Sequence, residues 1–460
     1  MKKNLALLTG CIMMQSFLNL NAQTTNIWYF GSNAGIDFNS GNAVILSNGA
    51  LNTYEGCATI CNNSGAILFY TDGSTVYNSI HSIMQNGTGL NGNFSSNQAA
   101  VIIPFPGNPD NYYIFTTDAT CSGPASYSVV DMTQAAGLGA VTIKNNLLLA
   151  SVTEKLTAVM DANGIDYWAV VHESNNSSFY SYHITATGVS APVVSTAGSV
   201  ISGTDCAGGM KLNPQGTQLA VTLEQSHTFE LFDFNNSTGI VSNARVLGPL
   251  SSYTYSCEFS GSGHYLYGNV DPGTNPMIYQ FDVTLGTAAA INASMIQVGT
   301  GNGSFHFGTL QNAPDGKIYV AREGEIYLGA INDPDVQGMA CNYVDTALLL
   351  SGSNTLGLPN YVASYFNINT GIKDYNKDND NFLIFPNPFT TKAMFSFINP
   401  NKEKFLFTLY DIMGRVIETI STDNNKIVLT KGSKQQGVYL FNLSGEKMGE
   451  RMNGKIVIGK

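Results

Sequence analysis

Six acidic residues follow turn sequences at nearly constant spacing along the chain. Each stands seven to nine residues after the last residue of a turn of the Pro-Asp-Gly kind, and they are Asp72, Asp118, Glu173, Glu224, Asp271 and Glu323. Carboxylates at equivalent points of a repeat can together bind a divalent cation such as Ca²⁺, or a basic partner. Acidic residues in turns also cap local backbone N–H groups. The six are therefore candidate metal ligands, with turn capping as the alternative.

Two other kinds of chemistry can be considered for the same segments. Glu173 and Glu224 could form a pair of carboxylates for glycoside hydrolysis. His172, next to Glu173, and His306, in SFHFG, could act as ligands or bases, although an isolated histidine is more often structural. The chain has no nucleophile elbow, Walker loop, HExxH motif or dinucleotide fingerprint. Catalytic residues therefore stay unassigned, and enzymatic activity is the less favoured function.

The turns that precede the six acids define a repeat. Their last residues lie at intervals of 46, 53, 52, 47 and 53 residues, and they are Gly65, Asn111, Gly164, Gly216, Gly263 and Gly316. A strand follows each turn, and further strands follow in several copies. A period of about 50 residues with this content is typical of the blades of a β-propeller. We expect the acids between the second and third strands of each blade, all on one face of the ring.

The ends of the repeat region bear on the number of blades. Ile27–Phe38 and Leu358–Phe366 are strand-like segments left over at the two ends, and pairing terminal strands in one sheet would close the ring. Seven blades are favoured, with six as the alternative. Composition agrees with an all-β class, because charged residues make up only 12 % of the chain while Tyr and Phe number 23 and 24.

Several segments carry a family likeness. PDGKIYVA (Pro314–Ala321) resembles WD40-like and YVTN-like propeller repeats. The stretch from 28 to 366 is similar to exported propeller proteins of gliding, Bacteroidetes-type bacteria, on the segments Glu55–Asn78, Asn108–Asp118 and Leu356–Phe366. The resemblance implies the fold but no ligand, because the role of that family is largely undefined.

The start of the chain indicates export. Residues 1–22 have the pattern of a signal peptide, with Lys2 and Lys3 before an apolar stretch and Ala22 at its end. Six of the seven cysteines follow it, and in an exported chain we expect buried thiols or one or two long-range disulfides. The net charge of −11 argues against nucleic acid as a partner.

The C-terminal part differs in charge and pattern from the rest. From Lys392 to Lys460, Lys and Arg outnumber Asp and Glu, which suggests a separate domain. Four or five strand-like runs there predict a small β-sandwich. The predicted organisation is a signal peptide at 1–22, a β-propeller at 23–366, a linker at 367–383 and a C-terminal domain at 384–460.

Four motifs of the last domain resemble the type A C-terminal sorting domain of the type IX secretion system. They are PNPF, FTLYDIMGRVIETI, GVYLFNLSG and GKIVIGK, in that order. On this resemblance the sorting signal includes Pro386, Asn387, Pro388, Tyr410, Asp411, Gly414, Gly437, Tyr439, Lys455 and Lys460. Without it, the same residues are turn glycines and solvated lysines of an ordinary sandwich.

The likeness to sorting domains implies partners and a destination. The partners would be the type IX secretion machinery and a sortase-like protease that removes the domain. The mature protein would then be joined to surface lipopolysaccharide or released. We therefore expect a secreted or cell-surface binding or adhesion protein with an unknown glycan or protein ligand, and a secreted carbohydrate-active enzyme is the alternative.

Overall fold

The structure is a computed structural model of the chain. It describes residues 22–119, 121–367, 382–385, 387, 389–397, 399, 402–411, 414–445 and 451–459. The expected signal peptide lies outside this part except for Ala22. The chain divides into two compact units, Met1–Asn369 and Thr370–Lys460, which are described one at a time. Within the described ranges, no helix has the length and apolar character needed to cross a membrane.

The first unit contains six sheets, and one of them, with eight strands, is made of two blades joined at their outer strands, so we number blades 1 to 7. Blades 1 to 3 comprise β1 (Ile27–Phe30), β2 (Ala34–Asp37), β3 (Val44–Leu46); β4 (Ala58–Cys61), β5 (Ile67–Thr71), β6 (Thr75–Asn78), β7 (Ile83–Thr88); and β8 (Ala100–Pro104), β9 (Asn111–Thr117), β10 (Ala125–Asp131), β11 (Ala140–Leu149). Blades 2 and 3 meet at their outer edges, where β7 and β11 pair at Gln85 and Ala140.

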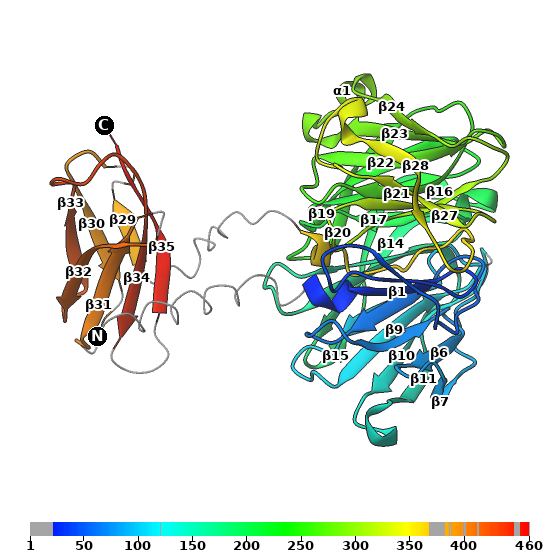
Figure 1. Cartoon of the computed structure of the whole chain (residues 1–460), viewed down its shortest axis with the longest axis horizontal. Helices are drawn as coiled ribbons and strands as arrows, with labels where there is room; N and C mark the ends of the chain where they lie inside the picture. Colours follow the sequence, from blue (N-terminus) through cyan, green and yellow to red (C-terminus); the bar gives the residue numbers. More distant parts are fainter. Residues whose placement is uncertain are drawn as a thin grey trace, which may run out of the picture. The chain divides into compact units, whose positions relative to one another are not determined.

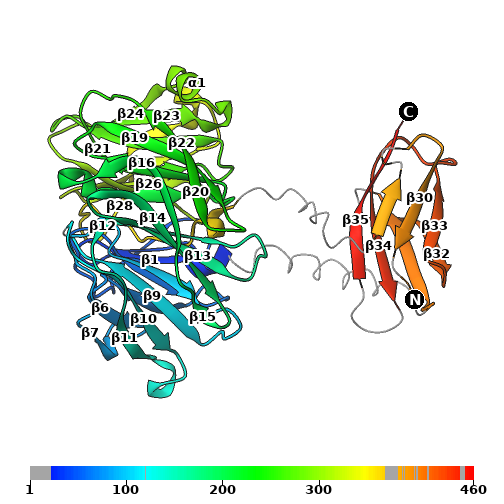
Figure 2. The ribbon, with the colours of Figure 1, turned by 180° about the vertical axis from the view of Figure 1, so that it is seen from behind.

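Blades 4 to 7 follow the same order. They comprise β12 (Val152–Met160), β13 (Tyr167–Glu173), β14 (Asn176–Thr185), β15 (Gly188–Val189), β16 (Val193–Ile201); β17 (Met210–Leu212), β18 (Gln218–Leu223), β19 (Thr228–Asn235), β20 (Ile240–Leu247); β21 (Tyr253–Phe259), β22 (Tyr265–Asp271), β23 (Met277–Asp282), β24 (Ile296–Thr300); and β25 (Phe307–Asn312), β26 (Ile318–Arg322), β27 (Tyr327–Ile331), β28 (Tyr343–Leu349). The colours in Figures 1 and 2 pass through these sheets in chain order.

Helices in this unit are short. They are η1 (Ala22–Thr25), η2 (Ala135–Gly137), η3 (Gly203–Cys206), η4 (Val283–Leu285), α1 (Ala288–Ala293), η5 (Gly338–Cys341) and η6 (Ala363–Phe366). The repeated turns have a common backbone cause. Gly65, Gly164, Gly216, Gly263 and Gly316 all have φ between 68° and 80°, the left-handed region that glycine adopts without a steric cost. In blade 3 the corresponding conformation falls on Gly107, before Asn111.

The inner strands of the blades form a ring. β4, β8, β12, β17, β21 and β25 pack each against the next. Between β25 and β4 lies the C-terminal segment of the unit, where Thr309 N donates to Leu356 O at 2.7 Å and Leu356 N donates to Tyr54 O at 2.9 Å. This segment therefore occupies the inner position of blade 1. The expected propeller is confirmed, and the described residues form seven blades.

The closing segment corrects one expectation, because 358–366 is not a strand. It makes isolated parallel bridges at Cys57–Pro359 and Ala158–Val362 and then enters η6. Pro359 has no N–H group to donate to a ladder, which prevents regular pairing here. Closure instead rests on packing: fully buried Trp28 contacts Tyr319 of blade 7 and Tyr361 of the closing segment, with ring centroids 6.0 and 6.1 Å apart.

The second unit contains two sheets. One has the order β29 (Phe382–Phe385), β30 (Lys392–Phe397), β33 (Lys426–Thr430), and the other has the order β32 (Val416–Thr422), β31 (Phe405–Tyr410), β34 (Gly437–Gly445), β35 (Arg451–Ile458). Phe395, Phe407 and Phe441 pack together between them, with ring centroids 5.0 to 5.5 Å apart. Strand β33 alternates buried and exposed residues, as expected when one face of a sheet covers a core. The predicted small sandwich is confirmed.

Candidate functional site

The structure places all six repeated acids where the second strand of a blade ends and the third begins. Asp72, Asp118, Glu224 and Glu323 are the residues directly after β5, β9, β18 and β26. Glu173 and Asp271 are the last residues of β13 and β22. In every blade the end of the second strand pairs with the start of the inner strand, as in Val152–Glu173 and Tyr253–Asp271. The acids and the inner-strand starts therefore share one end of the blades, which we call the acidic face.

Three of the six acids are engaged locally. Asp72 Oδ1 accepts from Ser74 N and Thr75 N at 2.8 and 2.7 Å. Asp118 Oδ1 accepts from Ala119 N at 2.7 Å and from Asn93 Nδ2 at 3.0 Å. The carboxylate of Glu173 accepts from Asn176 and Tyr180. Turn capping accounts for Asp72, whereas side-chain contacts hold Asp118 and Glu173.

Two of the remaining three acids share a partner. Asp271 and Glu323 lie on either side of His306: Nδ1 of the histidine contacts Asp271 Oδ2, and Nε2 is 4.0 Å from Glu323 Oε2. Tyr54 donates to Glu323 Oε1 at 2.5 Å, and this hydrogen bond raises the pKa of the tyrosine to about 12. Burial raises the pKa of Glu224, with Asp205 and Asp271 adding to the effect.

Two further acids on this face, Glu55 and Glu154, are absent from the sequence-based candidates. They are 8 % and 6 % exposed. Burial and the neighbouring charge of Glu154 together raise the pKa of Glu55 to about 9, although a hydrogen bond from Tyr255 opposes the shift. Burial raises the pKa of Glu154 to about 7, although Asn97 N donates to its Oε2 at 3.0 Å. Both lie just before or within the start of an inner strand, the position that antiparallel pairing brings next to the repeated acids.

One lysine is buried among these carboxylates. Lys155 follows Glu154 in β12 and is fully buried, and its Nζ donates to the carbonyl oxygens of Ala207 and Gly208 at 2.5 and 3.2 Å. Burial lowers its pKa to about 8, opposed by the charges of Glu154 and Asp205. Lys155 supplies one positive charge among several carboxylates, so the net charge at the centre of the acidic face is negative when those groups are ionised.

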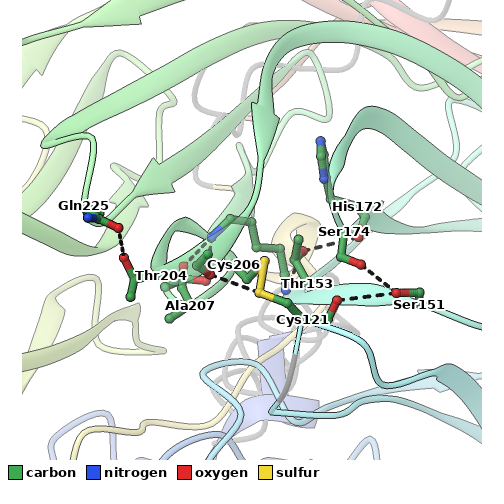
Figure 3. Close-up of a disulfide and its surroundings, with 12 residues drawn as sticks. Cys121, Ser151, Thr153, His172, Ser174, Thr204, Cys206, Ala207 and Gln225 are labelled. Atoms are coloured by element: carbon green, nitrogen blue, oxygen red, sulfur yellow. Dashed lines mark hydrogen bonds between the residues drawn. A yellow bond between two sulfur atoms is a disulfide. The ribbon is translucent and has the colours of Figure 1, made fainter.

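A disulfide fastens the loops on this face. Cys121, between β9 and β10, is bonded to Cys206 in η3, with a Cα–Cα distance of 5.7 Å and a sequence separation of 85. Figure 3 shows the bond between the hydrogen-bonded pairs Ser151–Ser174 and Thr204–Gln225. It links blade 3 to the start of blade 5. The expectation of long-range disulfides and buried thiols is confirmed, since the other four described cysteines are free and buried.

The candidate catalytic groups have different surroundings. His172 is fully buried, and burial lowers its pKa to about 3, so it stays neutral and away from solvent. The pKa of Glu224 is affected by Lys155, Asp205 and Asp271, whereas Glu173 bonds within its own blade. Among the described residues, no three His, Cys, Asp or Glu side chains are placed to hold one metal ion. Binding of Ca²⁺ by the repeated acids and catalysis by Glu173 and Glu224 stay predictions.

A cavity lies elsewhere, beside the junction of blades 7 and 1. It has a volume of about 390 Å³ and is lined by residues that include Asn42, Asp315, Lys317, Asn332 and Leu348. Asp315 accepts a hydrogen bond from Tyr319 at 2.9 Å, and its Oδ2 is 3.9 Å from Lys317 Nζ. Asp315 belongs to the turn between β25 and β26, which is the opposite end of the blade from Glu323. The cavity and the acidic face are therefore separate.

The residues expected to form the sorting signal lie at several points of the second unit. Asn387 exchanges hydrogen bonds with β35, donating to Lys455 O and accepting from Val457 N. Asp411 forms an ion pair with Arg415 at 2.7 Å across the tight turn that contains Gly414. Tyr410 ends β31, and Gly437 and Tyr439 belong to β34, where the Tyr439 hydroxyl donates to Gln435 O. Pro386, Pro388 and Lys460 lie outside the described residues.

Comparisons with known proteins identify the second unit. No curated protein matches the chain. Among solved structures, a putative 6-phosphogluconolactonase from Bacteroides fragilis has a TM-score of 0.46 at 11 % identity, covering 73 % of this chain and 97 % of that one. PorZ, a surface component of the type IX secretion system of Porphyromonas gingivalis, has a TM-score of 0.36 at 12 % identity, covering 95 % and 60 %.

These structural similarities are too low to support an argument, so the propeller assignment depends on the sheets themselves. The family comparison is specific. Residues 383–459 match the model of the secretion system C-terminal sorting domain. This range contains the four motifs except the final Lys460, and most of the second unit. The chain therefore carries a secretion system C-terminal sorting domain after a β-propeller.

Proposed function

We propose that the protein is exported by the type IX secretion system and acts at the cell surface as a binding or adhesion protein, with its ligand held on the acidic face. The sorting domain supports the route, and the propeller offers a rigid ring on which loops present side chains. After export, a sortase-like protease would remove the last domain within or near residues 367–383. The propeller would then be attached to lipopolysaccharide or released.

The buried carboxylates Glu55 and Glu154 are the observation that carries the binding assignment. Placing both next to each other in a poorly solvated site raises their pKa values and costs free energy whenever they ionise. Folding does not require such an arrangement, since neutral side chains would fill the same positions at a lower cost. Groups with strongly shifted pKa values cluster at functional sites.

A binding screen on the exported chain tests the proposal. The chain from residue 23 onward would be applied to glycan and protein arrays, next to a Glu55→Gln, Glu154→Gln variant and the exposed-turn control Asp110→Asn. We expect hits that the double variant loses and the control keeps. Hits that survive in the double variant would place the ligand elsewhere on the propeller.

The alternative function, a secreted carbohydrate-active enzyme, is tested on the same samples. A hydrolysis screen with polysaccharides would compare the wild type with Glu173→Gln and Glu224→Gln. Binding without turnover agrees with the proposal. Turnover that disappears in either variant would show that the protein is an enzyme, which would overturn the proposed binding function.

A further inference from the structure

Three polar side chains from neighbouring inner strands meet in the buried part of the ring. Lys211 in β17, Glu258 in β21 and Gln311 in β25 are 5 %, 4 % and 2 % exposed. Lys211 Nζ donates to Gln311 Oε1 at 2.6 Å and lies 3.3 Å from Glu258 Oε2. An amine, a carboxylate and a side-chain amide are therefore in contact away from solvent.

Backbone groups hold the carboxylate and the amide in place. Glu258 accepts from Phe259 N at 3.0 Å and from Asn312 N at 3.4 Å, and Gln311 Nε2 donates to Asn312 O at 3.1 Å. The carbonyl carbon of an amide is about 1.2 Å from its oxygen, so a small rotation of the Lys211 side chain brings Nζ onto that carbon. Groups held in this way react far faster than the same groups free in solution.

The charges of this cluster favour a reaction that removes them. A buried ammonium group and a buried carboxylate lose hydration, and their mutual attraction only partly offsets that loss. Burial raises the pKa of Glu258, and the charge of Lys211 opposes the shift. Transfer of a proton from Lys211 to Glu258 would leave a neutral amine, which is the nucleophilic form of lysine.

Other buried amines and amides of the propeller are arranged differently. Gln98 and Gln280 are buried too, but their carbonyl oxygens accept from backbone N–H groups. Lys155 is also buried, and its Nζ donates to backbone carbonyl oxygens, where an attack would have to cleave the main chain. The contact between Lys211 and Gln311 joins a buried amine to a side-chain amide, which can be exchanged with the main chain intact.

We propose that Lys211 and Gln311 form an intramolecular isopeptide bond, with Glu258 as the proton carrier. Lys211 Nζ bonds to Gln311 Cδ, the bond from Cδ to Nε2 breaks, and Nε2 leaves as ammonia. One proton of the ammonium group stays on Glu258, and a second passes through its carboxyl to Nε2, so no co-reactant is needed. The product is a neutral secondary amide beside a neutral carboxyl group.

The bond would add a covalent link to the ring. It would join β17 of blade 5 to β25 of blade 7, at a sequence separation of 100. The disulfide already joins blade 3 to the start of blade 5. Together the two links would tie blades 3, 5 and 7, independently of any ligand on the acidic face.

Mass spectrometry of tryptic peptides tests the bond on the chain from residue 23 onward, after reduction of the disulfide. With a free amine, trypsin cleaves after Lys211 and releases Leu156–Lys211 and Leu212–Arg245. With the bond formed, this cleavage is blocked, and 156–245 is recovered joined to Val246–Lys317. The joined species should be lighter than the sum of its two parts by one ammonia, about 17 Da. We expect it in most molecules.

Two variants and an internal control separate the reaction from a simple ion pair. Lys211→Arg keeps the positive charge but removes the nucleophile, and Glu258→Gln removes the proton carrier. We expect the joined species to be absent from the first and at least tenfold less abundant in the second. Lys144 Nζ donates to Asn86 Oδ1 at 3.0 Å in an exposed contact, so in the same digest its peptides should be separate. Tryptophan fluorescence checks that each variant is folded.

The digest of the wild type decides the inference even where a variant fails to fold. Complete recovery of the separate peptides on either side of Lys211 would refute the bond and leave a buried ion pair. A joined species of equal abundance in Glu258→Gln would refute the role of Glu258. Cyclisation of Gln23 at the start of the chain also releases ammonia, but it falls in a different peptide.

Discussion

Replacing Glu154 by Gln should stabilise the propeller at neutral and alkaline pH. Burial, with Glu224 and Asp118 adding to it, raises the pKa of this carboxyl from its ordinary value of 4.5 to about 7. A carboxyl with a raised pKa in the folded state binds more protons there than in the unfolded chain. Its stabilising contribution is therefore fully present below about pH 4.5 and is lost as the pH rises through about 7.

The size of the effect follows from the two pKa values. A change from 4.5 to about 7 corresponds to about 3 kcal/mol of unfolding free energy lost above pH 7. Glutamine stays neutral at every pH and can still accept from Asn97 N, although a neutral acceptor is weaker by about 1 kcal/mol. We expect E154Q to be about 2 kcal/mol more stable than the wild type at pH 8 and no more stable at pH 5.

Urea denaturation followed by tryptophan fluorescence measures this difference. The chain has two tryptophans, Trp28 and Trp168, both buried in the propeller, so the signal reports the first unit alone. Unfolding midpoints would be recorded from pH 4.5 to 8.5 for the wild type, E154Q and the control D110N. Parallel curves for the wild type and E154Q across this range would refute the desolvation of Glu154, because the variant removes the group whose titration should cause the decline.

Three further predictions follow from the contacts described above. Changing Cys121 and Cys206 to Ala should lower the unfolding free energy by about 2–4 kcal/mol, because the disulfide closes a loop of 85 residues; an unchanged urea midpoint would contradict this. Gly357→Ala should open the ring, because its Cβ would lie 1.7 Å from the backbone oxygen of Glu55, and a protease time course should then show faster cleavage of the closing segment. Deleting 383–459 should leave a folded propeller in the periplasm, and its appearance at the cell surface on fractionation would argue against the sorting role.

Local sequence patterns predicted the repeat well. The left-handed glycines Gly65, Gly164, Gly216, Gly263 and Gly316 mark one turn type that is fixed by backbone sterics, so their spacing followed the blades. The same reasoning placed the acids after the second strands. Closure was harder to predict, because 358–366 reads as a strand while Pro359 and the packing around Trp28 direct it along the inner strands.

The acids of the acidic face differ in how well the sequence predicts their contacts. Asp72 accepts from the backbone N–H groups two and three residues further on, so turn chemistry predicts its role. Glu55 and Glu154 are 99 residues apart and belong to different blades, and only the ring brings them into electrostatic range. A usable signal did exist: an acid at the start of an inner strand must lie next to the end of the second strand, since the two strands pair antiparallel.

The division between these two groups of acids explains why the centre of the face is the candidate site. A carboxylate that caps its own turn is stabilised by backbone N–H groups and contributes to folding. Glu55 and Glu154 oppose folding when they ionise, because burial and mutual repulsion favour their neutral forms at the pH where exposed carboxyls are charged. A cation that binds between the two carboxylates offsets both the burial and the mutual repulsion of their ionised forms. Binding of the cation therefore stabilises the folded state. This coupling predicts that a ligand whose binding depends on Glu55 and Glu154 raises the urea midpoint of the wild type more than that of E154Q.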